Sequence, residues 1–201
     1  MSSGSAGGIR ERKKHETREA LHRAALSLYL AQGPDAVTIS DICEAAGVSR
    51  RTFFNYFESK DDAVMDWNEE RAGGSVAERI AARPDQEEPL EAVHQAVRTG
   101  IVRLLEHETW RQRQLLVSRH PRLVPLAFAG NRRTRGLMAE AVARRIGAEP
   151  GDRYPRVLAA AANAVAQAAL AQWDPEDSGA ALLEILDASF AMAAAGFSPP
   201  S

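Results

Sequence analysis

The stretch TISDICEAAGVSRRTFFNYFESKDDAV, residues 38–64, decides the fold of this 201-residue chain. It contains two short helical patterns that are separated only by residues 47–49, a turn that holds one glycine. Thr38 is placed to cap the first helix with Asp41 as its capping-box partner, and Ser49 is placed to cap the second. Two short helices joined by so short a glycine-containing turn predict a helix-turn-helix.

Helical spacing gives each of these helices a buried face. On the first helix, three residues are expected to face inward: Ile42, Ala45 and Ala46. On the second helix, Phe53 and Phe57 lie four residues apart and share a face, which we expect to pack against Ile42 and Leu28. The opposite face of the second helix is then left for a partner.

That opposite face is expected to enter the major groove of double-stranded DNA. The residues predicted to contact bases are Arg50, Arg51, Phe54 and Asn55. A guanidinium grips O6 and N7 of guanine together, so the two arginines are candidates for sequence preference, unless they form only a solvated helix face. Phe54 either contacts a thymine methyl or a sugar, or folds back onto the preceding helix.

Polar side chains near the predicted helix starts suit the DNA backbone. Hydroxyl groups and an ammonium hydrogen-bond or pair with phosphates, and helix N-termini assist them. The six residues predicted to contact phosphates are Thr38, Ser40, Ser49, Thr52, Tyr56 and Lys60. Such contacts position a protein on DNA without reading its sequence.

The flanking segments extend this unit in both directions. A helix is expected over residues 10–32, stopped by Gly33-Pro34, after a flexible tail MSSGSAGG. Its charged opening, RERKKHETRE, is either an auxiliary DNA-binding arm or just a charged helix start. A fourth helix is expected from Ser59-Lys60 through residue 72, and a domain joint on it divides the chain into residues 10–66 and 67–198.

The second of these domains also reads as helical. Apolar residues recur at helical spacing from Leu90 to Leu105, then over residues 110–118, and again after Pro121 as far as Ile146. Two alanine-rich helices follow, separated by Asp174-Pro175. The alanine excess and the scarcity of β-branched runs favour helices throughout, so the fold class is all-α: an N-terminal three-helix helix-turn-helix domain plus a C-terminal helical domain.

Composition bounds the class of protein. The net charge is −2, yet residues 1–60 hold nine Lys and Arg against seven Asp and Glu, which makes the start of the chain its basic part. The single cysteine, Cys43, excludes an intrachain disulfide and suits a reducing compartment. With no signal-peptide pattern at its start and no apolar stretch long enough for a bilayer, the chain is expected in the cytoplasm, without a membrane partner.

Enzyme signatures are missing from the sequence. The five histidines lack metal-ligand spacing, and a lone Glu91–His94 pair falls short of a di-iron bundle, so no metal or other cofactor is expected. Nucleotide-binding and hydrolase motifs are also absent. Two other readings stay open beside DNA binding: a helical partner-binding module without DNA binding, and a small helical metalloenzyme.

The stretch around the predicted turn resembles the DNA-binding domain of the TetR family over residues 16–67. The residues that carry the resemblance are Thr38, Asp41, Ile42, Ala45, Ala46, Gly47, Val48, Ser49, Thr52, Phe53, Tyr56, Phe57 and Lys60. The resemblance implies a ligand-responsive transcriptional regulator, a repressor that binds a palindromic operator as a homodimer and is released by a small hydrophobic effector. It also makes the C-terminal domain a ligand-binding and dimerisation domain.

The resemblance further implies two sites in the C-terminal domain. The residues expected in a dimer interface between the last two helices are Leu158, Ala161, Ala162, Val165, Ala169, Leu182, Leu186 and Phe190. The residues expected to line a ligand pocket, if they are not plain core, are Trp67, Val97, Ile101, Leu104, Trp110, Leu116, Phe128 and Met138.

The segment from Trp110 through HPRLVPL is similar to TetR-type regulators of the mycofactocin cluster. That similarity implies acyl-coenzyme A thioesters as ligands. Seven arginines in this region would either hold a phosphorylated head group or form only solvated surface: Arg111, Arg113, Arg119, Arg122, Arg132, Arg133 and Arg135.

Overall fold

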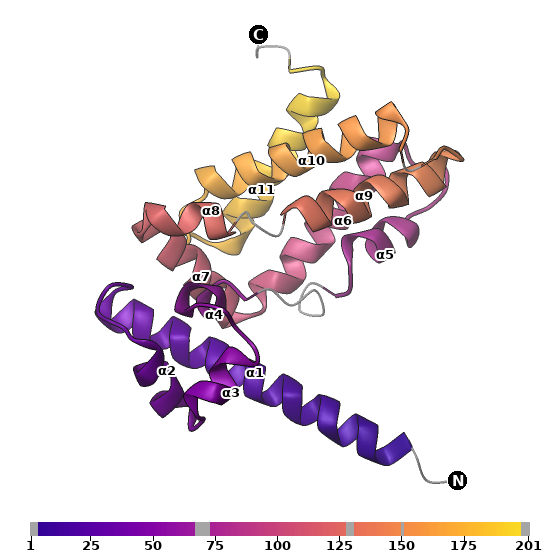
Figure 1. Ribbon diagram of the computed structural model, residues 1–201. Coiled ribbons are helices and arrows are strands. Elements are labelled where there is room, and N and C mark those ends of the chain that lie inside the picture. Colours follow the sequence, from indigo (N-terminus) through magenta and orange to yellow (C-terminus); the bar gives the residue numbers. More distant parts are fainter. Residues whose placement is uncertain (1–3, 67–72, 128–130, 150, 198–201) are drawn as a thin grey trace. The chain divides into compact units, whose positions relative to one another are not determined.

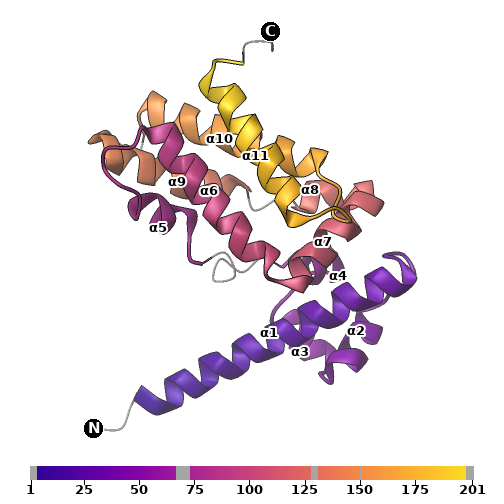
Figure 2. The same cartoon turned by 180° about the vertical axis from the view of Figure 1, so that it is seen from behind.

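The computed structural model describes residues 4–66, 73–127, 131–149 and 151–197, which form helices and turns with no strand among them (Figures 1 and 2). The all-α prediction is confirmed. The chain divides into two compact units. We call residues 1–66 and 112–127 the head, and residues 67–111 and 128–201 the body. Residues 112–127, which the sequence placed in the C-terminal domain, pack with the head instead.

The head is built on one long helix. Its elements are α1 (Gly4–Gln32), α2 (Ile39–Ala46), α3 (Arg50–Phe54), α4 (Lys60–Val64), the second part of α7 (Glu108–Arg119), η2 (Pro121–Leu123) and α8 (Val124–Ala127). Both α2 and α4 pack against α1. Buried Ile42, Phe53 and Phe57 belong to one apolar core that Leu28 packs against, as their spacing predicts. Leu21 and Leu123 are fully buried in the same core.

Four details of the head differ from the sequence predictions. Helix α1 begins at Gly4, so most of the opening expected to be a flexible tail is helical. Ala45 is exposed, because Cys43 rather than Ala45 shares the inward face of α2 with Ile42. Helix α3 ends at Phe54, so Phe57, predicted to lie on the same helix as Phe53, follows its end. Helix α4 spans five residues and ends at Val64, so it is far shorter than predicted.

The body contains five complete helices among its described residues. They are α5 (Val76–Ala81), α6 (Pro89–Leu105), α9 (Asn131–Ile146), α10 (Arg153–Gln172) and α11 (Gly179–Ala194). Helix α6 packs against α5 and α11, and α10 packs against α9 and α11. Together with Trp110 at the start of α7, these helices enclose one apolar core.

Helix α5 was missed at the sequence level, although its start carries a signal. The Ser75 side chain accepts a hydrogen bond from the Glu78 amide, and the Glu78 carboxylate accepts one from the Ser75 amide at 2.7 Å. This capping box fits the pattern of a serine followed three residues later by glutamate. The polar composition of the surrounding residues concealed it.

Candidate nucleic-acid interface and effector domain

The first turn of α2 is fixed by its cap. The Thr38 hydroxyl accepts from the Asp41 amide at 3.2 Å and donates to the Asp41 carboxylate, which also accepts from the Thr38 amide at 2.8 Å. That backbone hydrogen bond, followed by the one from the hydroxyl, lowers the pKa of Asp41. The capping box predicted from the sequence is therefore present.

The turn between α2 and α3 depends on Gly47. This residue ends α2 with φ of 66°, a left-handed conformation that glycine adopts at little cost. Two residues later the Ser49 hydroxyl accepts from the Thr52 amide at 3.1 Å and starts α3. The two caps and the glycine together set the direction in which α3 leaves α2.

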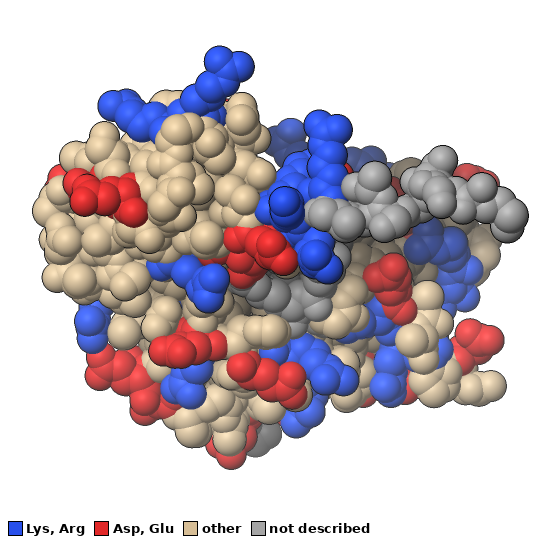
Figure 3. All heavy atoms as spheres, turned by 90° about the horizontal axis from the view of Figure 1, so that it is seen from below, with Lys and Arg blue, Asp and Glu red and all other residues tan. Residues whose placement is uncertain are grey.

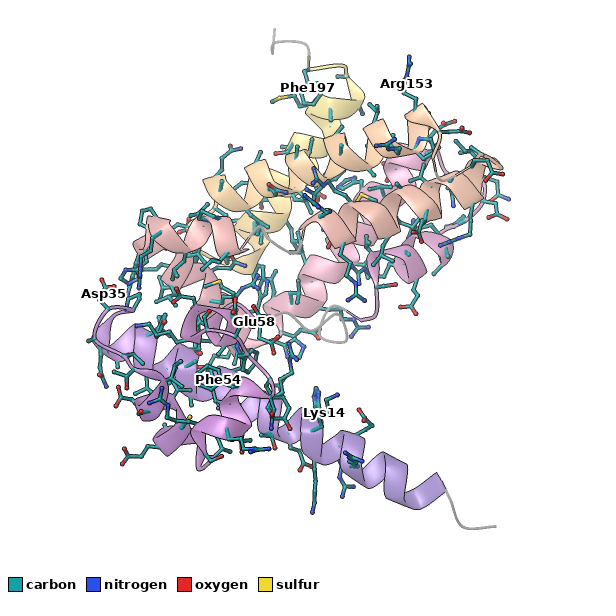
Figure 4. All side chains as sticks on the ribbon, viewed as in Figure 1. Lys14, Asp35, Phe54, Glu58, Arg153 and Phe197 are labelled. Carbon is teal, nitrogen blue, oxygen red and sulfur yellow. The ribbon has the colours of Figure 1, made fainter. Side chains whose placement is uncertain are left out.

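Helix α3 and the residues just after it have the buried side and the exposed side that the spacing predicts. The rings of Phe53 and Phe57 are buried and lie 5.9 Å apart. All four residues predicted to contact bases, Arg50, Arg51, Phe54 and Asn55, are exposed. Phe54 is 52% exposed, with its ring edge-on to that of Phe53 at 5.5 Å between centres (Figure 4). The predicted base-reading residues thus lie together on one accessible segment.

The residues predicted to contact phosphates divide into two groups. Thr38, Ser40 and Ser49 are exposed at the starts of α2 and α3, and Thr52 and Tyr56 are partly buried beside them. Amides in the first turn of a helix lack carbonyl partners within that helix, so the start of α2 can offer N–H groups to an anion.

Lys60 departs from this expectation. Its ammonium donates hydrogen bonds to the carbonyls of Pro34, at 2.9 Å, and Val37, at 2.7 Å, and it lies 5.9 Å from the centre of the Tyr29 ring. Two of its three protons are therefore used to hold the loop between α1 and α2. Lys60 thus has a role in the fold of the head that the sequence did not predict, and its phosphate contact stays a prediction.

Three further residues tie α1 to the α4 region, and sequence reasoning did not single them out. His22 Nδ1 lies 2.8 Å from the Ala63 carbonyl, and the Tyr29 hydroxyl donates to Asp61 at 2.6 Å. Burial, followed by this hydrogen bond, raises the pKa of Tyr29 far above its ordinary value.

Arg18 holds Asp66 with two hydrogen bonds, at 2.6 and 2.8 Å, and its guanidinium lies 5.0 Å from the centre of the Phe57 ring. A bidentate contact between a guanidinium and a carboxylate fixes their relative orientation as well as their distance. No local pattern reveals such pairs, because their members lie as many as 48 residues apart.

Cys43 is a core residue of the head. It is 4% exposed, and burial raises the pKa of its thiol, an effect that Arg50 opposes. A protonated, buried thiol is a poor nucleophile, which supports a structural role.

The predicted pocket residues lie in different places. Ile101, Leu104, Trp110 and Met138 are buried in the body core, and Val97 packs against it. Leu116 is buried in the head core, so its assignment to a pocket in the body is wrong. Trp67 and Phe128 lie outside the described residues.

The seven arginines predicted to lie near the pocket differ in their contacts and exposure. Arg111 donates to the carbonyls of Pro175, at 3.2 Å, and Asp177, at 2.8 Å, and so holds the turn between α10 and α11. Arg122 pairs with Asp35 at 3.0 Å in the head, and Arg113 is buried. The exposed members are Arg119, Arg122, Arg132, Arg133 and Arg135. Of these, Arg132, Arg133 and Arg135 belong to the body, the unit for which the role of holding a charged head group was predicted.

The predicted dimer-interface residues are mostly the protomer's own core. Those buried within a single chain are Ala162, Val165, Ala169, Leu182, Leu186 and Phe190. Leu158 is partly buried, and only Ala161 is exposed. The prediction chose the wrong face of α10 and α11, because the inward stripes of these helices pack against each other and against α6.

His94, considered above as half of a metal site, is part of this packing. It stacks on Phe190 with 4.5 Å between ring centres, and its Nε2 lies 2.8 Å from Asp187 of α11. Across the described residues, no group of three or more His, Cys, Asp or Glu is arranged to hold a metal ion.

Comparison with known proteins now identifies the family. The profile of bacterial regulatory proteins of the tetR family matches residues 21–63, and that of the MftR C-terminal domain matches residues 87–198, more than half of the chain. The chain belongs to the TetR family. It is therefore a transcriptional regulator of a non-enzymatic, DNA-binding family, and the metalloenzyme reading is set aside.

Two curated TetR-family relatives resemble the chain along most of its length. The transcriptional regulator TcmR of Streptomyces glaucescens is 32% identical over 174 residues, covering 83% of this chain and 76% of TcmR. MftR of Mycobacterium tuberculosis, a putative mycofactocin biosynthesis regulator, is 28% identical over 187 residues, or 92% and 93% of the two chains. The predicted resemblance to the mycofactocin type is thus confirmed.

Solved TetR-family structures support the fold. FadR of Thermus thermophilus, crystallised with lauroyl-CoA, has 22% identity and a TM-score of 0.57 and covers 92% of this chain and 96% of its own. A regulator from Syntrophomonas wolfei has 18% identity and a TM-score of 0.60, with coverage of 93% and 99%. As to membranes, none of the helices described for this TetR protein is long and apolar enough to span one.

Proposed function

We propose that this protein is a ligand-responsive transcriptional repressor that binds a palindromic operator as a homodimer and is released by a small hydrophobic effector. One observation carries the DNA-binding part of the proposal. Helix α3 carries buried Phe53 and exposed Arg50 and Arg51, its C-cap Asn55 is also exposed, and Phe57 is buried just after its end. Such a helix fits the major groove, where paired arginines select guanines.

Binding to the DNA that flanks its own gene tests this proposal. Wild-type protein is titrated against that DNA and against a shuffled duplex of equal length and composition. We expect a clear preference for the flanking DNA, and we expect Arg50→Ala to reduce this preference more than it reduces binding to the shuffled duplex. Equal binding to both duplexes by the wild type would favour the partner-binding module instead.

The dimer is proposed to form through the outer faces of α10 and α11. On α10, apolar residues recur at alternating steps of three and four and are exposed: Tyr154, Val157, Ala161, Ala164 and Ala168. On α11, the exposed face carries Ala188, Ala191 and Met192. Val157 is 60% exposed and Met192 50%, and small neighbours let helices approach closely. A two-fold pair would present two α3 helices to successive major grooves.

An acyl-coenzyme A thioester is the effector class that we propose. The FadR structure contains lauroyl-CoA, and the body of this chain matches the MftR type. An apolar body would take the acyl tail, and the exposed arginines near the start of α9, Arg132, Arg133 and Arg135, would suit the phosphates.

Helix α7 is the element that we propose for the coupling between effector and DNA. Helix α4 is too short for this role, since it ends at Val64. By contrast, residues 108–111 of α7 belong to the body and residues 112–119 to the head. A 100-fold loss of operator affinity requires about 2.7 kcal/mol of differential binding, within the usual range for such coupling.

Titration of a preformed operator complex tests the effector. Lauroyl-CoA, lauric acid and small aromatic compounds are added separately, and DNA release and tryptophan fluorescence are followed. We expect release by the thioester. Binding of the thioester without release would contradict the coupling, and release by aromatics alone would replace the acyl effector with a drug-like one.

A further inference from the structure

Helix α1 extends well beyond the part of the head that it helps to pack. From residue 10 onward, Leu21 is the first fully buried residue of α1, whereas residues 10–16 are all exposed. Figures 1 and 2 both show this N-terminal half of α1 running past α2 and α3. At 1.5 Å per residue, residues 10–20 alone form a rod of roughly 16 Å.

The charges on this rod are sorted by face. At 100° per residue, Arg10, Lys13 and Lys14 fall within about 100° of one another on one side. The acidic residues Glu11, Glu16 and Glu19 lie on the other side, where Glu16 pairs with Arg12 at 3.5 Å. One face of the rod is therefore basic, although the rod as a whole carries both signs.

The basic face continues the stripe by which α1 packs into the head. Lys14, Leu21 and Leu28 follow at steps of seven and so share a side of the helix. Leu21 is buried in the head core, and Leu28 packs against it. One turn after Lys14, the contact between Arg18 and Asp66 fixes the rotation of α1 about its own axis.

We propose that Arg10, Lys13 and Lys14 bind the phosphate backbone of DNA that flanks the operator half-site. This inference rests on the proposed operator binding. The positive charge of these residues is complementary to DNA phosphates. They are also continuous with the proposed DNA-binding surface, because they lie on the helix against which α2 packs (Figure 4). Figure 3 shows Lys and Arg side chains on the face seen from below, with Asp and Glu side chains among them.

A membrane surface would be a poor partner for this face. An interfacial helix needs a large apolar side opposite its basic one. The opposite side here carries Glu11, His15, Glu16 and Glu19. Phosphate contacts without base contacts would add affinity and salt dependence, but not sequence preference.

Two duplexes and two matched variants test the proposal. The short duplex ends at the outer edges of the operator, and the long one adds about eight base pairs of arbitrary sequence on each side. Arg10→Ala with Lys14→Ala removes two positive charges from the basic face. Arg12→Ala with Arg23→Ala removes two from the opposite face of the same helix.

We expect the wild type and the Arg12/Arg23 variant to bind the long duplex roughly 10-fold more tightly than the short one. The Arg10/Lys14 variant should lose this gain, and its salt slope on the long duplex should fall by roughly 3 to 4, since each phosphate contact contributes about 0.9 in each of two protomers. On the short duplex the two variants should bind alike.

If both variants lost the gain in affinity on the long duplex equally, the proposal would be overturned, because net charge alone would then explain that gain. A wild type indifferent to flank length would also overturn it while leaving operator binding intact. A wild type that binds neither duplex would remove the proposed function itself. Circular dichroism of both variants checks that they are folded. We expect them to be folded, because the substituted positions are exposed.

Discussion

At the scale of single residues, the head shows that a cation near a helix start can hydrogen-bond within the fold. Lys60 begins α4, as a phosphate-binding residue would, yet its ammonium reaches the carbonyls of Pro34 and Val37. Hydrogen bonds to a charged group contribute more than neutral ones, and buried carbonyls left without them are costly. Val37 is 1% exposed, so water cannot easily replace the lost donor.

Lys60→Met should therefore lower the free energy of unfolding by about 1 to 3 kcal/mol, as measured by urea denaturation. The salt dependence of operator binding should change little. Unchanged stability together with a salt slope lower by roughly 2 per dimer would restore the phosphate contact that the sequence predicted.

The cap of α2 makes a second prediction at this scale. Because the pKa of Asp41 is lowered in the folded protein, its carboxylate stabilises the fold above its ordinary pKa, and this contribution is lost as the pH falls through the lowered value. Wild type should melt at a higher temperature than Asp41→Asn at pH 7, and the difference should shrink below about pH 4. A difference that persisted at pH 2 would contradict the role of the charge.

Whether a residue's role could be predicted depends on how far away its partner lies. The Thr38–Asp41 box, the Gly47 turn and the Phe53 face follow from neighbours within four residues, and the sequence predicted all three. The Lys60 contacts bridge 23 and 26 residues, so no local pattern contained them.

At the scale of elements, helix starts were more predictable than helix lengths or packing partners. The caps at Thr38, Ser49 and Ser59 are where the sequence placed them, but α4 stops at Val64. The apolar pattern of α7 predicted a helix without revealing that Leu116 packs into the head while Trp110 packs into the body. Periodicity identifies a buried face, whereas its partner is decided by tertiary structure.

The start of α7 gives the prediction at this scale. Trp110 stacks on Trp173 with 5.8 Å between ring centres, and Arg111 holds the carbonyls of Pro175 and Asp177. Arg111→Ala should leave operator affinity within about twofold of wild type but weaken the release caused by lauroyl-CoA, because α7 would be less firmly held by the body.

Arg153→Ala, which removes an exposed charge at the start of α10, is the matched control and should release DNA like the wild type (Figure 4). DNA release is followed by fluorescence anisotropy at a fixed thioester concentration. An Arg111→Ala protein that responds like this control would remove α7 from the coupling.

At the scale of the whole molecule, dimerisation is proposed through a surface that the protomer does not itself use. The apolar stripes first expected to pair are consumed within one chain, since Val165 is 7% exposed and Leu186 is fully buried. Both helices nevertheless keep a second apolar face outward, around Val157 and Ala164 on α10 and around Ala191 on α11. Two apolar faces on one helix indicate that one packs within the protomer and the other against a second copy.

Charges placed on the two faces should therefore have different effects. Val157→Glu with Ala164→Glu should give folded monomers with near-normal melting and weakened operator binding, because one α3 alone reads too few bases. Val165→Glu should instead unfold or aggregate the protein, since it would bury a charge in the body core. Sedimentation velocity at micromolar concentration and thermal melting distinguish these outcomes. A wild type that sediments as a monomer, or a doubly charged outer-face variant that remains dimeric, would show that the copies meet elsewhere.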